Sequence, residues 1–373
     1  MRIGIDARMY GSQYTGIGNV VKNLTYELFK LDSKNEYVMF MLPKEFKNFR
    51  LPTDRVTKVE VSAKRFSYTE QLSLPWKFLK QKVDLMHFPD FVTPIFYPGK
   101  FVATIHDITP VFFPGPRQAE SRFYRLTFQT IFKNTLRKAR KIITVSEYTK
   151  KDLIKYFKVR EEKIVVIHNG VDERFKASND KNITNEIKQK YNISKPFIFY
   201  VGQQVPHKNI HGLVKAFRRL VENKKLDIEL LIGGKPSSWY FELYQTLDDL
   251  PKEIRKRIYS PGFIPDEDLI ALYNAASVFC LPSFYEGFGM SVLEAMKCGA
   301  PVVASNLTSI PEACGDAALY FDPNNIDEMI EKLHQGLTDE RLRGSLRQKG
   351  FEQSEKFSWE KAARKVLEVY NEV

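Results

Sequence analysis

The residues best suited to chemistry lie in one segment of the C-terminal half, PSFYEGFGMSVLEAMKCGAPVVAS, residues 282–305. Glu286 precedes a Gly-Phe-Gly turn, and Glu294 lies on the second turn of a helix expected from about residue 290 to 297. A glycine-containing loop at a helix N-terminus offers backbone N–H groups and the positive end of the helix dipole, and both favour phosphate. Carboxylates accept paired hydrogen bonds from sugar hydroxyls. The spacing therefore favours a site in which two acids bracket a diphosphate, although each acid alone could equally be a solvated surface residue.

Two other segments carry polar residues just after apolar strands. In FYVGQQVPHKNIHGLVKAF, residues 199–217, Lys208 stands before a helix and could neutralise a phosphate, or could be a plain surface lysine. In TIHDITPVFFPG, residues 104–115, His106 and Asp107 end an apolar strand. A lone histidine is more often structural than catalytic, so these two residues gain weight only from their context.

The elements that must position these residues are short apolar strands alternating with helices, the pattern of parallel α/β sheets. Strands are expected at residues 2–6, 37–42, 56–61, 85–88, 101–106, 141–145 and 164–167, and again at 197–201, 226–232, 278–281, 301–304 and 319–321. The polar stretch 172–192 between the two sets is expected to be a linker or a domain edge. Two successive α/β units are therefore predicted, with ligands at the carboxyl ends of the strands.

The string EGFGMSVLEAMKCGAPVVAS, residues 286–305, closely resembles the E-x7-E region of retaining glycosyltransferases of the family-4 type, also called group 1 glycosyltransferases. Residues 262–283 and the ending FSWEKAARKVLEVY resemble the same family. The resemblance implies the GT-B fold, in which two Rossmann-like parallel-sheet domains face each other across a cleft. By that resemblance, residues 1–175 form the acceptor domain, residues 176–357 the nucleotide-sugar donor domain, and the helix 358–373 packs back on the acceptor domain.

The resemblance also implies roles for individual residues. Glu286 would contact the hydroxyls of the donor sugar, Glu294 the ribose, and His106 would lie near the donor sugar and the acceptor, with Asp107 as its helper or an acceptor contact. His106 and Glu286 are thus the implied catalytic pair, with Glu286 positioning the sugar. The other implied donor-binding residues are Gly16, Gly18, Gln203, Lys208, Phe263, Ile264, Gly287, Phe288, Gly289 and Met290.

Two of these assignments stand on weaker ground. The family usually supplies an Arg and a Lys to the diphosphate from the loop that holds Lys208, and Gln203 stands near the expected Arg. An amide can still donate a hydrogen bond there. The Gly16–Gly18 loop, residues 14–19, is equally compatible with a tight turn, since a lone G-x-G is a weak signal.

No metal and no cofactor are expected; the nucleotide-sugar is a substrate. Asp266-Glu267-Asp268 is formally a D-x-D triplet, but it opens a helix, where acids serve as N-cap and first-turn residues. His207 and His211 have i, i+4 spacing without a third ligand. The leaving diphosphate would therefore be stabilised by Lys208, backbone amides and a helix dipole. Retention is implied by the family, and front-face attack is our hypothesis because no nucleophile stands out.

The charge of the chain is uneven. Its net charge is +12, and residues 1–180 hold 32 Lys and Arg against 19 Asp and Glu, which suggests an anionic partner for this half. Aromatic and basic residues interleave within residues 117–141, the pattern of a helix that meets anionic lipid or, equally, of a solvated helix whose aromatic side is core. The basic residues are Arg117, Arg122, Arg125, Lys133, Arg137, Lys138, Arg140 and Lys141, and Lys64, Arg65, Trp76, Lys77 and Lys80 could extend the patch. Arg122 and Arg125 are taken as acceptor or membrane contacts.

The composition limits the compartment and the partners. Three cysteines, no apolar leader and no 18-residue apolar run favour a cytoplasmic protein. A peripheral location on the inner face of the plasma membrane is compatible with the same features. No nucleic-acid-reading module is recognisable, so no nucleic-acid partner is expected.

Several functions remain open. The layout TGIGNV…HDITPVFFP resembles bacterial mannosyltransferases that build cell-surface polysaccharide, which favours GDP-mannose as donor and a glycan or lipid-linked acceptor. The alternatives are a UDP- or dTDP-sugar donor, as in glucosyl-, N-acetylglucosaminyl- or rhamnosyl-type transferases, or an epimerase or phosphorylase of the same fold. From another class, a donor-binding pseudoenzyme or a basic membrane- or nucleic-acid-binding protein would also carry these features.

Overall fold

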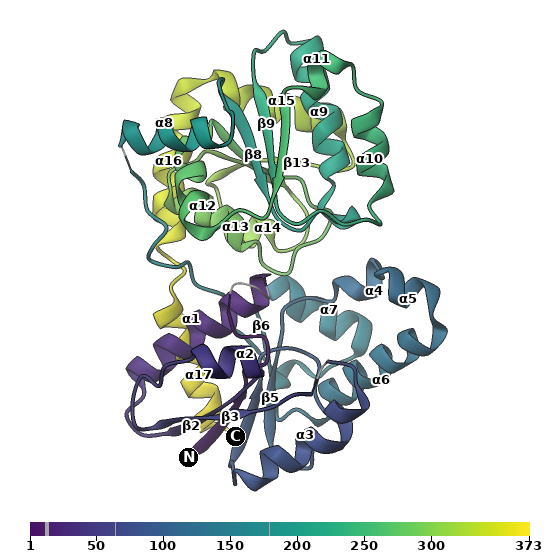
Figure 1. The fold of residues 1–373 in the computed structure, drawn as a ribbon, viewed down its shortest axis with the longest axis vertical. Helices are drawn as coiled ribbons and strands as arrows, with labels where there is room; N and C mark the ends of the chain where they lie inside the picture. The colour runs from purple at the N-terminus through teal and green to yellow at the C-terminus, as the bar shows by residue number, and fades with distance from the viewer. Residues whose placement is uncertain (12–14, 64, 179) are drawn as a thin grey trace. The chain divides into compact units, whose positions relative to one another are not determined.

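The chain folds into two compact units in a computed structural model that describes residues 1–11, 15–63, 65–178 and 180–373 (Figure 1). Unit 1 comprises Met1–Gly170 with Ser358–Val373, and unit 2 comprises Val171–Phe357. The sequence analysis placed the first boundary at residue 175. Tyr14 of the loop before the first helix, and Lys64 of the basic patch, lie outside the described residues.

Unit 1 is built on a seven-stranded parallel sheet in the order β3-β2-β1-β4-β5-β6-β7. Its strands are β1 (Arg2–Asp6), β2 (Glu36–Met41), β3 (Val56–Glu60), β4 (Leu85–Phe88), β5 (Phe101–Ile105), β6 (Lys141–Thr144) and β7 (Ile164–Val166). Its helices are α1 (Thr15–Leu31), α2 (Pro43–Asn48), α3 (Tyr68–Lys80), α4 (Thr109–Phe112), α5 (Pro116–Glu120), α6 (Arg122–Lys138), α7 (Glu147–Phe157) and α17 (Trp359–Asn371), with the 3₁₀ turn η2 (Glu161–Lys163). The central strands are buried on both sides, as a sheet covered by helices requires.

Unit 2 is built on a six-stranded parallel sheet in the order β10-β9-β8-β11-β12-β13. Its strands are β8 (Phe197–Val201), β9 (Glu229–Gly233), β10 (Ile258–Gly262), β11 (Val278–Leu281), β12 (Val302–Ser305) and β13 (Ala318–Phe321). Its helices are α8 (Lys181–Lys190), α9 (Ile210–Glu222), α10 (Phe241–Asp248), α11 (Lys252–Arg255), α12 (Asp266–Ala275), α13 (Met290–Lys297), α14 (Ile310–Cys314), α15 (Ile326–Thr338) and α16 (Glu340–Ser354), with the 3₁₀ turn η3 (Pro206–Lys208).

The predicted α/β class with two parallel sheets is confirmed, with two local corrections. The stretch 172–192 is more than a linker, because it contains helix α8, which is capped by Asp180 and packs its one buried residue, Ile187, beside α12. Strand β10 is absent from the expected strands because its sequence, IYSPG, carries proline and glycine. Such residues are tolerated at the edge of a sheet, where β10 lies.

Each sheet has one point at which the strand order reverses. In unit 1 that point lies between β1 and β4, and in unit 2 it lies between β8 and β11. The loops that follow two such strands turn away from each other and leave a crevice at the carboxyl edge of the sheet, where parallel α/β proteins bind ligands. Ligand-binding residues are therefore expected in the loops at these two edges.

The final helix, α17, belongs to unit 1 and is anchored there by a buried polar contact. Ser358 caps the helix by accepting a hydrogen bond from the Lys361 amide (3.2 Å), and the helix packs against α1. Near its end, the Tyr370 hydroxyl is hydrogen-bonded to Nδ1 of His87 in β4 (2.6 Å), whose Nε2 is bonded to the Thr104 hydroxyl (2.9 Å). Burial lowers the pKa of His87 to about 3, so its ring stays neutral and both nitrogens are used.

Replacing Tyr370 with Phe tests this anchor. The variant leaves a buried nitrogen of His87 without its partner, and we expect unit 1 to lose about 1–2 kcal/mol in its free energy of unfolding. Urea denaturation followed by circular dichroism measures the loss. The matched control is Tyr68→Phe, since Tyr68 is 81% exposed and should tolerate the change without effect. Equal stability of the two variants would contradict the assigned role of Tyr370.

Candidate active site

The strand reversal in unit 2 brings Lys208 and Glu286 together. Lys208 ends the 3₁₀ turn after β8, and Glu286 lies in the loop after β11. The Lys208 ammonium is 2.6 Å from Oε2 of Glu286, while the Ser283 hydroxyl donates to Oε1 (2.7 Å). The side chains of Lys208 and Glu286 are only 19% and 12% exposed, so this charged pair is largely shielded from water. A cation and a carboxylate thus meet at the edge where a ligand is expected.

The backbone around Glu286 is tied to the loops that follow the two neighbouring strands, β12 and β8. The Glu286 amide donates to the Thr308 hydroxyl (3.1 Å), and the Ser309 hydroxyl donates to the Glu286 carbonyl (2.8 Å), both from the loop after β12. The Phe284 amide donates to the carbonyl of His207, in the loop after β8 (2.8 Å). The carboxylate is therefore held from several sides, and its position does not depend on a single flexible loop.

Helix α13 begins at Met290, four residues after Glu286, and presents its N-terminus at the same edge. Gly289, its N-cap, has φ +93° and ψ +48°, a left-handed conformation that glycine adopts without strain. The first amides of a helix lack acceptors on a preceding turn, and with the helix dipole they favour an anion at the N-terminus. In α13 the Val292 amide already donates to the Gly289 carbonyl (3.2 Å), so this role falls to the amides before it. The Phe288 side chain is buried against Phe357 (ring centroids 5.4 Å apart), so only its backbone can face a ligand. The backbone role implied for this segment fits this arrangement.

Glu294, on the second turn of α13, is kept in an unusual state by its surroundings. The Tyr273 hydroxyl donates to its Oε2 (3.0 Å). Burial raises the pKa of Glu294 to about 7 in spite of that hydrogen bond, and the nearby Asp266 and Asp172 contribute in the same direction. A ligand that donates hydrogen bonds to this carboxyl would stabilise its ionised form and lower its pKa.

Three other donor-binding candidates lie near this edge in different environments. Gln203 is exposed, whereas its neighbour Gln204 is buried and donates through Nε2 to the Gly234 carbonyl and the Ser260 hydroxyl, both at 3.1 Å. Gln204 therefore fixes the loop, and Gln203 is left at the surface. Phe263 is 66% exposed after β10, while Ile264 is buried against the backbone of β9.

The residues considered as metal ligands have other partners. Pro265 is the N-cap of α12, so Asp266, Glu267 and Asp268 are first-turn residues and none of them is the cap, which corrects part of the sequence interpretation. Asp268 is paired with Lys190 (2.7 Å) and accepts from the Tyr191 hydroxyl (2.7 Å). His211 is hydrogen-bonded through Nδ1 to the Tyr240 hydroxyl (2.9 Å), and burial lowers the pKa of His207 to about 3.

In unit 1, His106 follows β5 and has a defined tautomer. Its Nε2–H donates to the Pro89 carbonyl (2.8 Å), which leaves Nδ1 as the acceptor nitrogen. Burial lowers its pKa, while the Pro89 contact and Asp107 act in the opposite direction, so the ring is neutral at physiological pH. Asp107 itself accepts from the Thr109 amide (2.8 Å) and fixes the start of α4.

Gly16 and Gly18 lie inside the first turns of α1, which begins at Thr15, so the expectation of a loop at these two residues was wrong. At Gly18 a Cβ atom would lie 2.0 Å from the Gly11 carbonyl oxygen, and the Gly11 amide donates to the Gly18 carbonyl (3.2 Å). Gly18 is therefore required for the close approach of the loop after β1. This packing role depends on a contact with Gly11 that has no signature in the local sequence.

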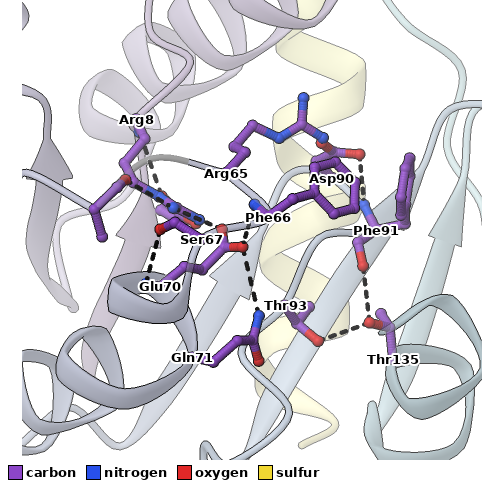
Figure 2. A network of polar contacts seen from close by, with 12 residues as sticks. Arg8, Arg65, Phe66, Ser67, Glu70, Gln71, Asp90, Phe91, Thr93 and Thr135 are labelled. Carbon is purple, nitrogen blue, oxygen red and sulfur yellow. Dashed lines mark hydrogen bonds and ion pairs between the residues drawn. The ribbon is translucent and has the colours of Figure 1, made fainter. Parts of the chain in front are cut away.

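The strand reversal of unit 1 holds a charged network that the sequence analysis missed (Figure 2). Arg8, after β1, is 4% exposed; it donates from Nε and Nη2 to both oxygens of Asp6 (2.8 and 2.7 Å), and its Nη1 is 2.7 Å from Glu70. Next to it, Arg65 is paired with Asp90, which follows β4. Asp6, Arg8, Arg65 and Asp90 line a small pocket together with Pro89, the residue that His106 contacts. The only local signal was the capping box Ser67-x-x-Glu70, which places Glu70 at the start of α3.

The basic surface of unit 1 divides into buried and exposed parts. Helix α6 buries Phe128, Ile131 and Phe132 in the core but exposes Phe123 (71%) and Leu126 (62%) beside the exposed Arg122 and Arg125. Arg65, assigned to the same patch, is instead engaged by Asp90. Throughout the described ranges, every helix is too short or too polar to cross a bilayer.

Helix α3 adds an exposed apolar stripe to this surface. Tyr68, Leu72, Trp76 and Leu79 are 81, 62, 68 and 41% exposed, and their i, i+4, i+8 and i+11 spacing puts them on one side of the helix. Phe66, two residues before Tyr68, packs near Tyr124 of α6, with ring centroids 5.4 Å apart.

Comparison with known proteins gives consistent matches over both units. The family model described as Glycosyl transferases group 1 matches residues 183–353, and the model Glycosyltransferase Family 4 matches residues 14–175. The chain is 32% identical over 296 residues to the O-antigen chain mannosyltransferase B of Escherichia coli, which covers 79% of this chain and 76% of that protein.

A second relative and a solved structure extend the comparison. The serotype-specific mannosyltransferase WbdA of Escherichia coli is 30% identical over 245 residues, which is 65% of this chain but only 30% of that protein. The structure of Alr3699/HepE from Anabaena, in complex with UDP and glucose, superposes with a TM-score of 0.79 at 17% identity, covering 100% of this chain and 99% of that one. At that identity the likeness concerns the fold alone, which is GT-B.

The raised pKa of Glu294 predicts a pH-dependent cost of burial. Because the folded-state pKa, about 7, lies above the ordinary value of 4.5, the protonated form stabilises the fold below pH 4.5 and this stability is lost as the pH rises to 7. We therefore expect Glu294→Gln to be more stable than the wild type at pH 8, by about 1–3 kcal/mol, and equal to it near pH 4.5.

Melting temperatures of the ligand-free protein between pH 4.5 and 8 test this expectation. Glu340→Gln, a change at an exposed acid of α16, is the matched control and should follow the wild type throughout. A Glu294→Gln curve that runs parallel to the wild type at every pH would contradict the assigned environment of Glu294.

Proposed function

This chain belongs to the group 1 glycosyltransferases, and we propose that it is a retaining, metal-independent hexosyltransferase. It would transfer mannose from GDP-mannose to a glycan or lipid-linked acceptor in cell-envelope polysaccharide synthesis. The glycosyltransferase activity follows from the family. The preference for mannose is supported by the names of the two Escherichia coli relatives, both mannosyltransferases. The observation that carries the proposed site is the Lys208–Glu286 pair beside the N-terminus of α13.

The donor would bind at the strand reversal of unit 2. Its diphosphate would lie against the Lys208 ammonium and the first amides of α13, which supply positive charge without a bound ion. Glu286, already held by Ser283 and Lys208, would accept hydrogen bonds from the hexose hydroxyls with its remaining lone pairs, and Glu294 would accept from the ribose. Gln203, at the surface of the same loop, is free to offer an amide to the diphosphate.

Bond cleavage at the anomeric carbon makes two demands. The leaving diphosphate gains negative charge, which Lys208 and the helix dipole would stabilise, and the sugar gains positive charge of oxocarbenium type. The acceptor hydroxyl would attack from the face that the diphosphate leaves, so that configuration is retained. Neutral His106 could accept a hydrogen bond at Nδ1 from the donor sugar or the acceptor, because its Nε2–H is committed to Pro89.

A second donor class has its own support. The Anabaena protein of the same fold is in complex with UDP and glucose, which favours a UDP-sugar as the alternative, with dTDP-sugars beside it. The alternatives share a nucleoside diphosphate linked to a sugar, and they differ in the base, in the identity of the sugar and, for dTDP, in the missing 2′-hydroxyl of the ribose. The residues that would contact the base, near Phe263, lie on a different loop from Lys208 and Glu286.

We also propose that the enzyme works at the inner face of the plasma membrane, where a lipid-linked acceptor would be found. The exposed apolar residues of α3 and of the first turns of α6 lie beside Lys77, Lys80, Arg122 and Arg125. An apolar stripe flanked by cations suits a surface of anionic lipid, which offers both an apolar interior and negative head groups.

Turnover of purified protein tests the proposed reaction. We expect GDP release from GDP-mannose in the presence of acceptor to exceed that from UDP- and dTDP-sugars and to be unaffected by EDTA. Lys208→Ala and Glu286→Gln should each lower kcat by about 10²–10³-fold, because they remove charge stabilisation and sugar positioning in the transition state. Lys215→Ala, a lysine on the same helix-bearing segment with no assigned role, is the control.

The same assay separates the parts of the proposal. An inverted anomeric configuration of the product by NMR would disprove retention, and inactivation by EDTA would disprove metal independence. A preference for UDP-glucose would transfer the proposal to the alternative donor. Full activity in Lys208→Ala would contradict the assigned site.

Membrane docking is tested with sedimenting vesicles. We expect the protein to bind vesicles that contain phosphatidylglycerol at low salt, and Trp76→Ala/Phe123→Ala to bind about tenfold more weakly, since two apolar anchors are removed. Phe241→Ala/Tyr244→Ala, which removes two exposed aromatic side chains of α10, is the control. Binding that is absent in the wild type, or equal in both variants, would contradict docking through α3 and α6.

A further inference from the structure

Unit 1 contains an open basic pocket at the edge of the sheet opposite to His106. It lies at the amino ends of β5 and β6 and encloses about 1090 Å³ of empty space, counting the part open to solvent. Among the residues that the structure describes, Glu162 is the one acid in its lining. Its basic residues are Lys100, Arg137, Lys138, Arg140, Arg160 and Lys163. Since β5 runs from Phe101 at the pocket to Ile105 before His106, roughly 15 Å of strand separates the pocket from the candidate site.

Three of these cations have a structural role. The Lys163 ammonium donates to the carbonyls of Leu136 (2.7 Å) and Arg137 (2.8 Å) in the last turn of α6, where helical carbonyls lack partners. Lys138 donates to the Ile95 carbonyl (2.8 Å), and Lys100 donates to the backbone oxygen of Val373 (3.0 Å). These contacts account for the three lysines at this end of the sheet, but the side chains of the arginines take no part in them.

The three arginines are left without a comparable role. Arg137 and Arg140 are exposed, and within the ranges the structure describes no ion pair or hydrogen bond of either guanidinium group is recorded. Arg160 meets only Glu162 (3.3 Å), and both side chains are mostly exposed, so that pair contributes little. Burial lowers the pKa of Lys163, and Arg160 and Arg140 lower it further, which shows that the cations are close enough to repel one another.

We propose that this basic pocket binds a phosphate or phosphodiester group, with Arg137, Arg140 and Arg160 as its principal ligands and the half-buried Lys163 as a further cation in its lining. A guanidinium offers paired N–H donors that match two phosphate oxygens, and several of them around one pocket match a dianion. A bound anion would also relieve the mutual repulsion of the cations. The pocket is independent of the nucleotide-sugar site, because it lies in unit 1 and at the amino edge of the sheet.

The phosphate could belong to a soluble molecule or to a lipid head group, and two arms of one experiment distinguish them. Inorganic pyrophosphate is titrated into the protein by calorimetry at 50 mM salt, and vesicles with or without phosphatidylglycerol are sedimented with it. The test variant is Arg137→Ala/Arg140→Ala. The control is Lys47→Ala/Arg50→Ala, which removes the same charge from two exposed residues near α2. Arg137→Lys/Arg140→Lys keeps the charge but loses the paired donors.

We expect the alanine test variant to lose about tenfold in affinity in at least one arm, relative to the control, and the lysine variant to fall between them. A loss confined to pyrophosphate identifies a soluble phosphate ligand, and a loss confined to anionic vesicles identifies a lipid head group. Trp76→Ala/Phe123→Ala leaves the pyrophosphate arm unchanged in the first case. The proposal is overturned if the test variant and the control bind pyrophosphate and vesicles equally.

Discussion

The candidate site of unit 2 is organised around one charged contact at the reversal of its strand order, the pair of Lys208 and Glu286. Two charges that are mostly removed from water cost desolvation energy, and such a pair adds little net stability to a fold. Its geometry is nevertheless secured by Ser283, Thr308 and Ser309 from two adjacent loops. A desolvated charge pair that is held rigidly at a ligand-binding edge is typical of a preorganised site. In such a site, positive charge is already in place where a leaving group becomes negative.

Glu294 is a second carboxyl group at this site that is largely removed from water. Burial beside Tyr273 raises the pKa of Glu294 to about 7, so in the ligand-free protein its ionised form is less stable than it would be in water. A ligand that donates hydrogen bonds to it repays that cost, which links donor binding to the ionisation of one residue. In unit 1 the corresponding edge carries Arg8, Asp6 and Glu70, a fully engaged network that fixes the loops around the pocket lined by Arg65 and Pro89.

Local pattern was sufficient where a residue's own neighbours decide its structure. The strand β11 and the helix α13 have the bounds expected from their apolar residues, their glycines and the following strand. Pattern failed at β10, where Pro261 and Gly262 imitate a turn, and at α8, whose polar sequence leaves only Ile187 to pack. In both places the partner that stabilises the element is far away in the sequence.

The candidate site divides in the same way. The loop positions of Lys208, Glu286 and His106 follow from the strands that precede them, and so they could be placed from the sequence. The ion pair of Arg8 with Glu70 joins two distant segments, and the pKa of Glu294 depends on Tyr273 from another helix. Such properties arise from tertiary contacts and have no local signature. The packing role of Gly18 is of the same kind, since it depends on the approach of Gly11.

The central claim is that unit 2 binds a nucleotide-sugar through its diphosphate without a metal, and a thermal-shift screen tests it most directly. The protein is heated with GDP, UDP, dTDP, ADP and their common sugar conjugates, with and without EDTA. A ligand at about 100 times its Kd stabilises the folded state by about 2.7 kcal/mol, which raises the melting temperature. The account predicts the largest rise with GDP and GDP-mannose, unchanged by EDTA. The absence of a rise with every nucleotide, or a rise that EDTA abolishes, would contradict it.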